Sequence, residues 1–221
     1  AAQLTLMNAD FAAMPVIVGE GRRVINNITR AASLFLVKTL YSFLLSVLML
    51  FLPLAYPLQP VQLTLISSLT VGIPSFFLAL EPNQERVRGS FLETVLRRAL
   101  PGAVAVAVCS ALAMASGQVF GLTMDVDNTI ACLVTALVGL LVLLRVCVPL
   151  NPARGALLAV MTAGLVCGVT LAGKVFFLVP LQGTAVWITL GLCVLALGLM
   201  LLVEGLMKRV EKQREVSKAM G

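Results

Sequence analysis

A membrane-length apolar segment at residues 60–74, PVQLTLISSLTVGIP, combines hydroxyl side chains with residues that weaken a helix. Prolines and a glycine interrupt the backbone hydrogen-bond ladder, and hydroxyl and carbonyl oxygens can replace the hydration shell of an ion. The pattern therefore indicates a helix that loosens where something polar binds. The alternative is an ordinary membrane helix whose hydroxyls bond back to carbonyls four residues earlier, and the sequence leaves it open.

Two sets of candidate residues follow from the first interpretation. Hydroxyls that recur every three residues share one broad face of a helix, so the candidate ion-pathway residues here are Thr64, Ser67 and Thr70. Residues that free backbone carbonyls are candidate unwinding positions, namely Pro60, Gly72 and Pro74. No metal ligand set is identified, because the five cysteines are scattered over the last four apolar segments and the chain has no histidine.

The preceding apolar segment contains Lys38, with Thr39 and Ser42 on the same broad helical face. A charge inside a membrane helix costs roughly 2.5–3.5 kcal/mol unless it meets water or a partner. Lys38 is therefore a candidate internal cation that occupies or gates a transport site. Its long side chain can instead reach the membrane interface or pair structurally, and these alternatives stay open.

The composition shows which elements must carry these residues. Hydrophobic residues make up 60% of the 221 and charged residues 12%, with a mean hydropathy of +1.03, so a soluble domain is excluded. Near-continuous apolarity also excludes an outer-membrane barrel. We expect an all-α polytopic bundle of six transmembrane helices in the cell membrane. The predicted spans are 32–56, 60–80, 99–121, 128–149, 156–180 and 184–206.

Basic residues predict the orientation of these spans. Lys and Arg gather before the first span, between the second and third, between the fourth and fifth, and after the sixth, and only Lys174 is discordant. Because such residues stay on the cytoplasmic side, we expect both termini there. Topology and attraction to anionic lipid thus explain the net charge of +6, and no nucleic-acid partner is expected.

The segments outside the apolar runs divide the chain into predicted regions. Residues 1–30 include a predicted short strand at 4–7, which has no partner strand, and a basic helical connector at 16–30, so the chain reads as a fragment of a larger protein. The remaining predicted regions are a site helix pair at 31–80, a charged cytoplasmic loop at 81–98, a four-helix support bundle at 99–207 and a basic cytoplasmic tail at 208–221.

Three features in order resemble the carboxy-terminal membrane half of P-type cation-transporting ATPases. They are GEGRRVINNITRAASLFLVKTLYSFLL at 19–45, PVQLTLISSLTVGIPSFFLALEP at 60–82, and a six-span layout with both ends cytoplasmic. The leading AQLTLMNADFAAMP is similar to the end of the family's phosphorylation domain, so residues 1–30 would be its tail and connector. Within the family, the chain resembles the bacterial group called cation-transporting ATPase E, for which calcium transport has been proposed.

The resemblance implies that the first two spans line the ion site. The positions of the family's calcium site would fall on Thr39, Ser42, Ser67, Thr70 and Val71. The family's site includes a threonine, a glutamate and an aspartate; here only the threonine is kept, as Thr70, and both carboxylates are absent. A hard divalent ion prefers several oxygen ligands, with negative ones among them. The missing charge would then come from a glutamate in the amino-terminal half of the pump, which this chain lacks.

The resemblance also implies that this chain cannot hydrolyse ATP by itself. The family's DKTGT, TGE and GDGxND motifs are absent, so no cofactor is expected in this chain, and ATP and magnesium belong to the parent protein. The leading hypothesis is the membrane-transport portion of an ATP-driven pump that moves a small inorganic cation, calcium first, by alternating access. Alternative cargoes are magnesium, potassium or a lipid, and the alternative proteins are a stand-alone six-span permease or a non-catalytic membrane scaffold.

Overall fold

The computed structural model describes residues 14–83, 86 and 90–220, and all regular structure in them is helical. Six helical segments are long and apolar enough to cross a membrane, which confirms the predicted all-α polytopic fold. The predicted strand at 4–7 lies outside the described residues. The elements are α1 (Met14–Phe51), α2 (Pro60–Ser67), the π-helix η2 (Ser68–Gly72), α3 (Ile73–Leu80), α4 (Phe91–Phe120), α5 (Met124–Cys147), α6 (Pro152–Thr170) and α7 (Thr184–Met220).

Local chemistry accounts for several helix ends. Ser90 and Asn151 precede α4 and α6, and their side chains accept hydrogen bonds from the backbone N–H three residues ahead, at 3.3 and 2.7 Å. Gly121 follows α4 with φ 67°, a left-handed conformation that glycine adopts without strain. Pro60 lies at the first position of α2, where the N–H that proline lacks has no helical partner anyway.

Most helix boundaries differ from the predicted spans, and α7 continues to Met220 through the predicted basic tail at 208–221. Three other differences have a local explanation. The first span and its basic connector form one continuous helix, α1, because no breaker interrupts the pattern between them. The fifth span ends at Thr170 rather than at 180, since a series of turns follows it. The second half of the predicted 81–98 loop is helical, because the Ser90 cap starts α4 at Phe91.

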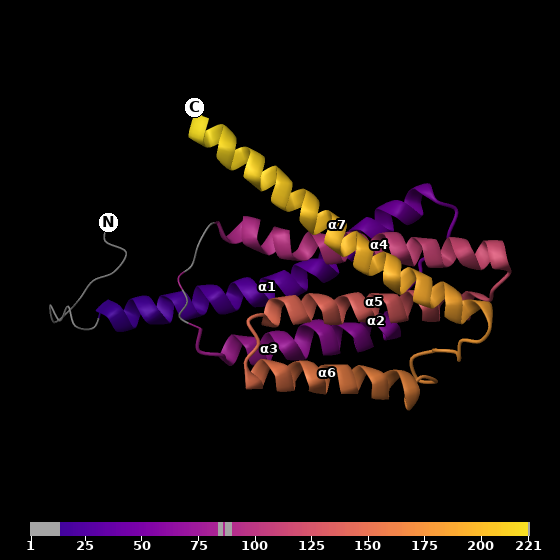
Figure 1. Cartoon of the computed structure of the whole chain (residues 1–221). Coiled ribbons are helices and arrows are strands. Elements are labelled where there is room, and N and C mark those ends of the chain that lie inside the picture. Colours follow the sequence, from indigo (N-terminus) through magenta and orange to yellow (C-terminus); the bar gives the residue numbers. More distant parts are fainter. Residues whose placement is uncertain (1–13, 84–85, 87–89, 221) are drawn as a thin grey trace.

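The bundle is organised around α4, which contacts α1, α5 and α7 (Figure 1). Its small residues, including Ala99, Ala103 and Ala113, are fully buried, which allows neighbouring helices to approach closely. The α2–η2–α3 span lies between α5 and α6, and α6 forms one edge of the bundle. The amino end of α1 and the carboxyl end of α7 both extend beyond the bundle on the left of Figure 1.

Large apolar side chains cover the outer surface of the helices. Phe43 of α1 is 63% exposed, and Trp187 and Val194 of α7 are 75% and 70% exposed. Such a surface is stable against lipid chains and unfavourable in water. The chain is therefore a multi-pass membrane protein, while the side of the membrane on which its termini lie stays a prediction.

Candidate functional site

The second span changes helix type at its centre. Between α2 and α3, residues Ser68–Gly72 form a π-helix, in which the N–H of Ile73 donates to the carbonyl of Ser68, five residues back. Such π-helical turns are rare and concentrate at functional sites, because they alter the carbonyl positions within a helix. Gly72 and Pro74 lie at the end of this break, whereas Pro60 lies a full α-helix away, at the first turn of α2.

A small, partly enclosed cavity adjoins the π-helix. Its volume of about 10 Å³ is close to the least that a water molecule needs. Four of its lining side chains carry a polar group, and they come from three different spans: Lys38 and Tyr41 of α1, Thr70 of η2 and Thr135 of α5. The rest of its lining is mainly apolar. We call this the Thr70 cavity.

The structure brings together two of the residues singled out in the sequence, Lys38 and Thr70. Lys38 is half-buried and Thr70 is 3% exposed. None of the ion pairs found among the described residues includes Lys38. The side chains of Lys38 and Thr70 therefore line the same cavity, next to the break in the second span.

The other predicted pathway residues do not line this cavity. Thr39 and Thr64 are exposed, and each hydroxyl donates to the carbonyl four residues earlier, at 3.2 and 3.0 Å. Thr70 makes the same type of bond, to Ile66 at 2.8 Å. Back-bonding, which the sequence left open, thus occurs at these three threonines. The half-buried Ser42 instead lies near Tyr56 of the α1–α2 connection.

Two buried polar atoms of the second span have no hydrogen-bond partner in the structure, the hydroxyl of Ser67 and the amide nitrogen of Gln62. Ser67 immediately precedes the π-helix. Buried polar groups without partners are uncommon and mark places where another polar group can bind. Ser67 therefore remains a candidate ligand even though it does not line the Thr70 cavity, and Gln62 is an addition that sequence reasoning missed.

Glycines on neighbouring helices bring the π-helix into close contact with the support helices. A methyl group at Gly139 of α5 would lie 2.9 Å from Cγ2 and 3.0 Å from Oγ1 of Thr70. On α6, methyl groups at Gly164 and Gly168 would lie 3.2 and 2.8 Å from Leu69 and Leu65. Bulkier residues would crowd these side chains, and the short Thr70 side chain can move aside less easily than the ends of the two leucines.

Sequence reasoning missed Thr135, which is 1% exposed and shares a 3.4 Å hydrogen bond with Ser110 of α4. It is one hydroxyl in a long apolar run, and only the packing of α5 against the π-helix makes it part of the cavity. The candidate site thus extends beyond the first two spans into the predicted support bundle.

A second polar cluster lies at one end of the same span. Glu81 follows α3, and its carboxylate is 2.9 Å from the guanidinium of Arg30 on α1 and 2.8 Å from that of Arg154 on α6. Asn151 also donates to it at 2.7 Å. We call Glu81 with Arg30, Arg154 and Asn151 the Glu81 clasp, because it joins three helices through one carboxylate.

Backbone contacts extend the clasp along both of its neighbours. The side chain of Asn27 donates to the carbonyls of Ala79 and Glu81 at 2.9 and 2.8 Å. Arg154 also donates to the carbonyls of Cys147 and Pro149 in the α5–α6 connection. Sequence reasoning used the two arginines only as topology signals and missed Glu81 as their partner, because no local pattern links residues so far apart in the chain.

The clasp controls the ionisation of Glu81. Burial by itself would raise the pKa of this carboxyl, but hydrogen bonds from Arg154 and Asn151 and the charges of Arg154 and Arg30 outweigh it and hold the pKa below its ordinary value. Glu81 is therefore a carboxylate at neutral pH, and it compensates part of the cost of burying two guanidiniums.

Among the residues that the structure describes, no group of three or more His, Cys, Asp or Glu side chains could hold a metal ion. A cation bound at the Thr70 cavity would have to be held by hydroxyl and carbonyl oxygens, because no carboxylate lines this cavity. This donor set is weak for a divalent ion, which prefers negatively charged ligands among its oxygens.

Comparison with known proteins identifies relatives over half to two thirds of the chain. Over 115 residues the chain is 44% identical to the Calcium-transporting ATPase CtpE of Mycolicibacterium smegmatis. The matched stretch covers 48% of this chain and 14% of that protein. Over 119 residues it is 43% identical to the CtpE of Mycobacterium tuberculosis, with shares of 49% and 15%. Over 156 residues it is 36% identical to the Probable cation-transporting ATPase exp7 of Streptococcus pneumoniae, with shares of 67% and 20%.

The chain thus matches at most a fifth of the length of these relatives. No family model matches it, and no solved structure matches it.

Proposed function

Because this chain belongs to the P-type cation-transporting ATPases, we propose that it forms the transport part of an ATP-driven pump whose cargo is a small cation, with calcium the leading choice. The names of two relatives support calcium. Alternating access would occur through α1 and the α2–η2–α3 span. Phosphorylation, with ATP and magnesium as its requirements, would take place in parts of the pump that this chain does not contain.

The observation that carries this proposal is the juxtaposition of the π-helix with Lys38 and Thr70. A π-helical turn can revert to α-helix by moving its extra residue along the span, which repositions carbonyls without unfolding the helix. Such a change would alternately offer oxygens to a dehydrated ion and withdraw them. The glycines of α5 and α6 permit the contact that holds this mobile turn.

Lys38 gives the site a way to remain electrically balanced. A fixed positive charge beside the Thr70 hydroxyl repels a bound cation, by several kcal/mol at short range when water is excluded. We propose that the ammonium group withdraws when the cation binds and returns when it leaves. The negative charge that a divalent ion needs would come from a span that is not part of this chain.

The Glu81 clasp supplies the mechanical link in this proposal. α1 extends beyond the bundle at its amino end, so a force applied there would act on α1 first. Because Glu81 and Asn27 bind the end of α3 to α1, tilting α1 would pull α3 while α2 stays with its neighbours. The π-helix lies between these two halves and would absorb the movement.

The decisive test compares two threonines of the same span in the full-length pump. Thr70→Val removes the cavity hydroxyl at nearly constant volume, and Thr64→Val removes an exposed hydroxyl that makes the same back-bond. We expect Thr70→Val to raise the cation concentration for half-maximal phosphoenzyme formation about tenfold, which corresponds to about 1.4 kcal/mol. Thr64→Val should change it less than twofold.

Equal responses of the two variants would refute a transport site at the π-helix. A panel of calcium, magnesium and potassium, with each cation titrated into the same phosphorylation assay, identifies the cargo. Phosphorylation that depends on none of these cations but responds to added phospholipid would favour the lipid-transport alternative.

A further inference from the structure

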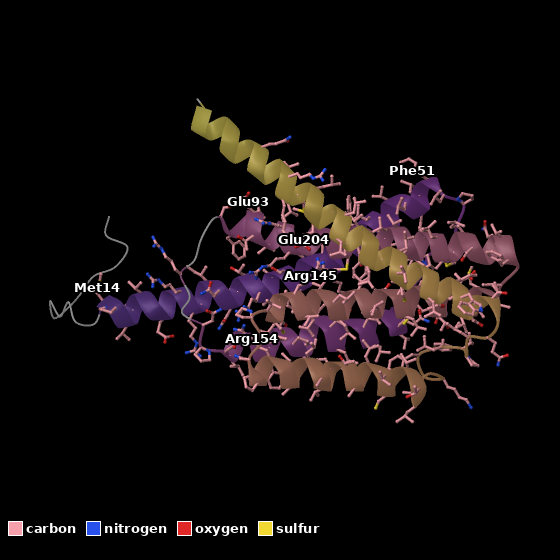
Figure 2. The ribbon with its side chains drawn as sticks, viewed as in Figure 1. Met14, Phe51, Glu93, Arg145, Arg154 and Glu204 are labelled. Atoms are coloured by element: carbon pink, nitrogen blue, oxygen red, sulfur yellow. The ribbon has the colours of Figure 1, made fainter. Side chains whose placement is uncertain are left out.

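A second group of charges lies where α7 crosses α4 and α5. Glu204 of α7 is 3.1 Å from the guanidinium of Arg145 on α5 and 2.9 Å from the ammonium of Lys208, one turn further along α7. Arg97 of α4 is close enough to act on Glu204 electrostatically. Figure 2 shows Arg145 and Glu204 together beside α7. We call these four residues the Glu204 cluster.

The positions along the helices place this cluster at the edge of the bilayer. A helix rises about 1.5 Å per residue, so Glu204 lies about 30 Å from the start of α7 and Arg145 about 32 Å from the start of α5. Arg97 lies about 35 Å from the far end of α4 by the same measure. Since the hydrocarbon core is about 30 Å thick, all three residues fall at the level of the lipid phosphates.

Exposure distinguishes this cluster from the Glu81 clasp. The side chains of Arg145 and Lys208 are 35% and 60% exposed, whereas those of Arg30 and Arg154 are only 6% and 8% exposed. Two cations contact a single carboxylate, so the pairs leave a surplus positive charge, to which the exposed Arg209 adds. Because Glu204 orients the cations without neutralising them, they can accept an additional anion.

The surface beside the cluster is suited to acyl chains. Leu201 and Leu197 lie three and seven residues before Glu204, on the same face of α7, and are 64% and 41% exposed. They extend from the cluster toward the middle of the bilayer. A molecule that fits both features carries an anionic phosphate attached to hydrocarbon chains.

We propose that the Glu204 cluster is a binding site for the headgroup of an anionic phospholipid. The phosphate contacts Arg145 and Lys208, and the acyl chains lie along Leu201 and Leu197 of α7. Arginine and lysine side chains at the end of a membrane span are the usual partners of lipid phosphates. Bound lipid strengthens the attachment of α7 to α5, because the ion pair between these helices, Arg145–Glu204, is partly exposed and therefore weak.

The test uses the full-length protein in detergent, to which phosphatidylglycerol, phosphatidylcholine or inorganic phosphate is added. We expect phosphatidylglycerol to raise the unfolding midpoint of the wild type and to give retained lipid adducts in native mass spectrometry. The variant is Arg145→Gln combined with Lys208→Gln, which should lose more than half of the rise. The control is Lys174→Gln, which removes an exposed lysine in the 171–183 connection, beyond the far end of α6, and should keep the full rise.

Lys208→Gln alone serves as a second variant should the double variant fail to fold, because Lys208 is largely exposed and its loss should weaken lipid retention without affecting folding. A full rise in the cluster variants overturns the proposal. An equal rise with phosphatidylcholine shows that the headgroup charge is not recognised, and an equal rise with inorganic phosphate assigns the site to a free anion. Either of these results also overturns it.

Discussion

The Glu81 clasp and the Thr70 cavity lie along the same span, but their polar groups differ in how they are hydrogen-bonded. In the clasp, one carboxylate accepts from two buried guanidiniums and an amide, at 2.7–2.9 Å. In the cavity, the Thr70 hydroxyl bonds only its own helix, and its neighbour Lys38 belongs to none of the ion pairs among the described residues.

This difference makes the clasp a rigid contact and the cavity an adaptable one. Removing one member of a buried ion pair exposes the full desolvation cost of its partner, so the clasp resists opening. A hydroxyl that bonds back to its own helix loses little when it turns toward another group. Movement of the span should therefore concentrate at the π-helix, and the end of α3 should remain attached to α1 and α6.

The largest effect is expected from Glu81→Gln. The change leaves Arg30 and Arg154 buried beside a neutral group, so the free energy of unfolding should fall by about 3–5 kcal/mol. Unfolding of the purified full-length protein in detergent measures it. Glu20→Gln, which removes an exposed carboxylate 3.5 Å from Arg23, is the matched control and should cost less than about 1 kcal/mol. Similar losses in both variants would show that the clasp is not the stronger joint.

Gly139→Ala tests whether the cavity depends on the close approach of α5. The added methyl group would lie within 3.0 Å of the Thr70 side chain, so the π-helix must shift, at a cost of about 1–3 kcal/mol. Gly191→Ala on α7, where nothing lies within 4 Å, should instead stabilise the protein by up to about 1 kcal/mol. The free energies of unfolding of the two variants should thus change in opposite directions, and a stabilising Gly139→Ala would contradict the contact.

Lys38→Met examines the electrostatic role of the cavity lysine. Loss of the positive charge should strengthen cation binding, so the cation concentration for half-maximal phosphoenzyme formation should fall severalfold in the full-length pump. Lys38→Arg keeps the charge and should stay within twofold of the wild type. Unchanged cation dependence in Lys38→Met would remove the internal-cation hypothesis and favour a side chain that reaches the interface.

Acidification should lower the stability contributed by the clasp gradually, and by less than the Glu81→Gln substitution does. Because the folded-state pKa of Glu81 lies below its ordinary value, its contribution to stability is complete above the unfolded pKa, about 4.3–4.5, and is lost as the pH falls through the folded value. Between pH 7 and 5, Glu81 should therefore add no pH dependence to the unfolding midpoint, because its contribution is complete over this range. In Glu81→Gln, the decrease below pH 4.5 should be shallower than in the wild type, and an identical pH profile would contradict this.

Much of the fold could be predicted from the sequence, because apolar run length and local capping chemistry act within one helix. The second span was predicted at 60–80 and runs from Pro60 to Leu80. Gly72 and Pro74, predicted as unwinding positions, lie at the end of the π-helix, and Thr70 was selected from its spacing and from the family resemblance. The π-helix itself was not predicted; it packs closely against glycines of later helices, Gly139 and Gly164, and no local pattern shows such packing.

The sequence by itself determined that the chain crosses a membrane six times and that oxygen-bearing residues interrupt its second span, because these properties depend on composition and short-range hydrogen bonding. Only the tertiary structure decided which polar groups meet. It joined Glu81 to Arg154, 73 residues away, and added Thr135 to the cavity of Lys38 and Thr70. Packing between helices depends on side-chain shape over long separations, and no local pattern encodes it.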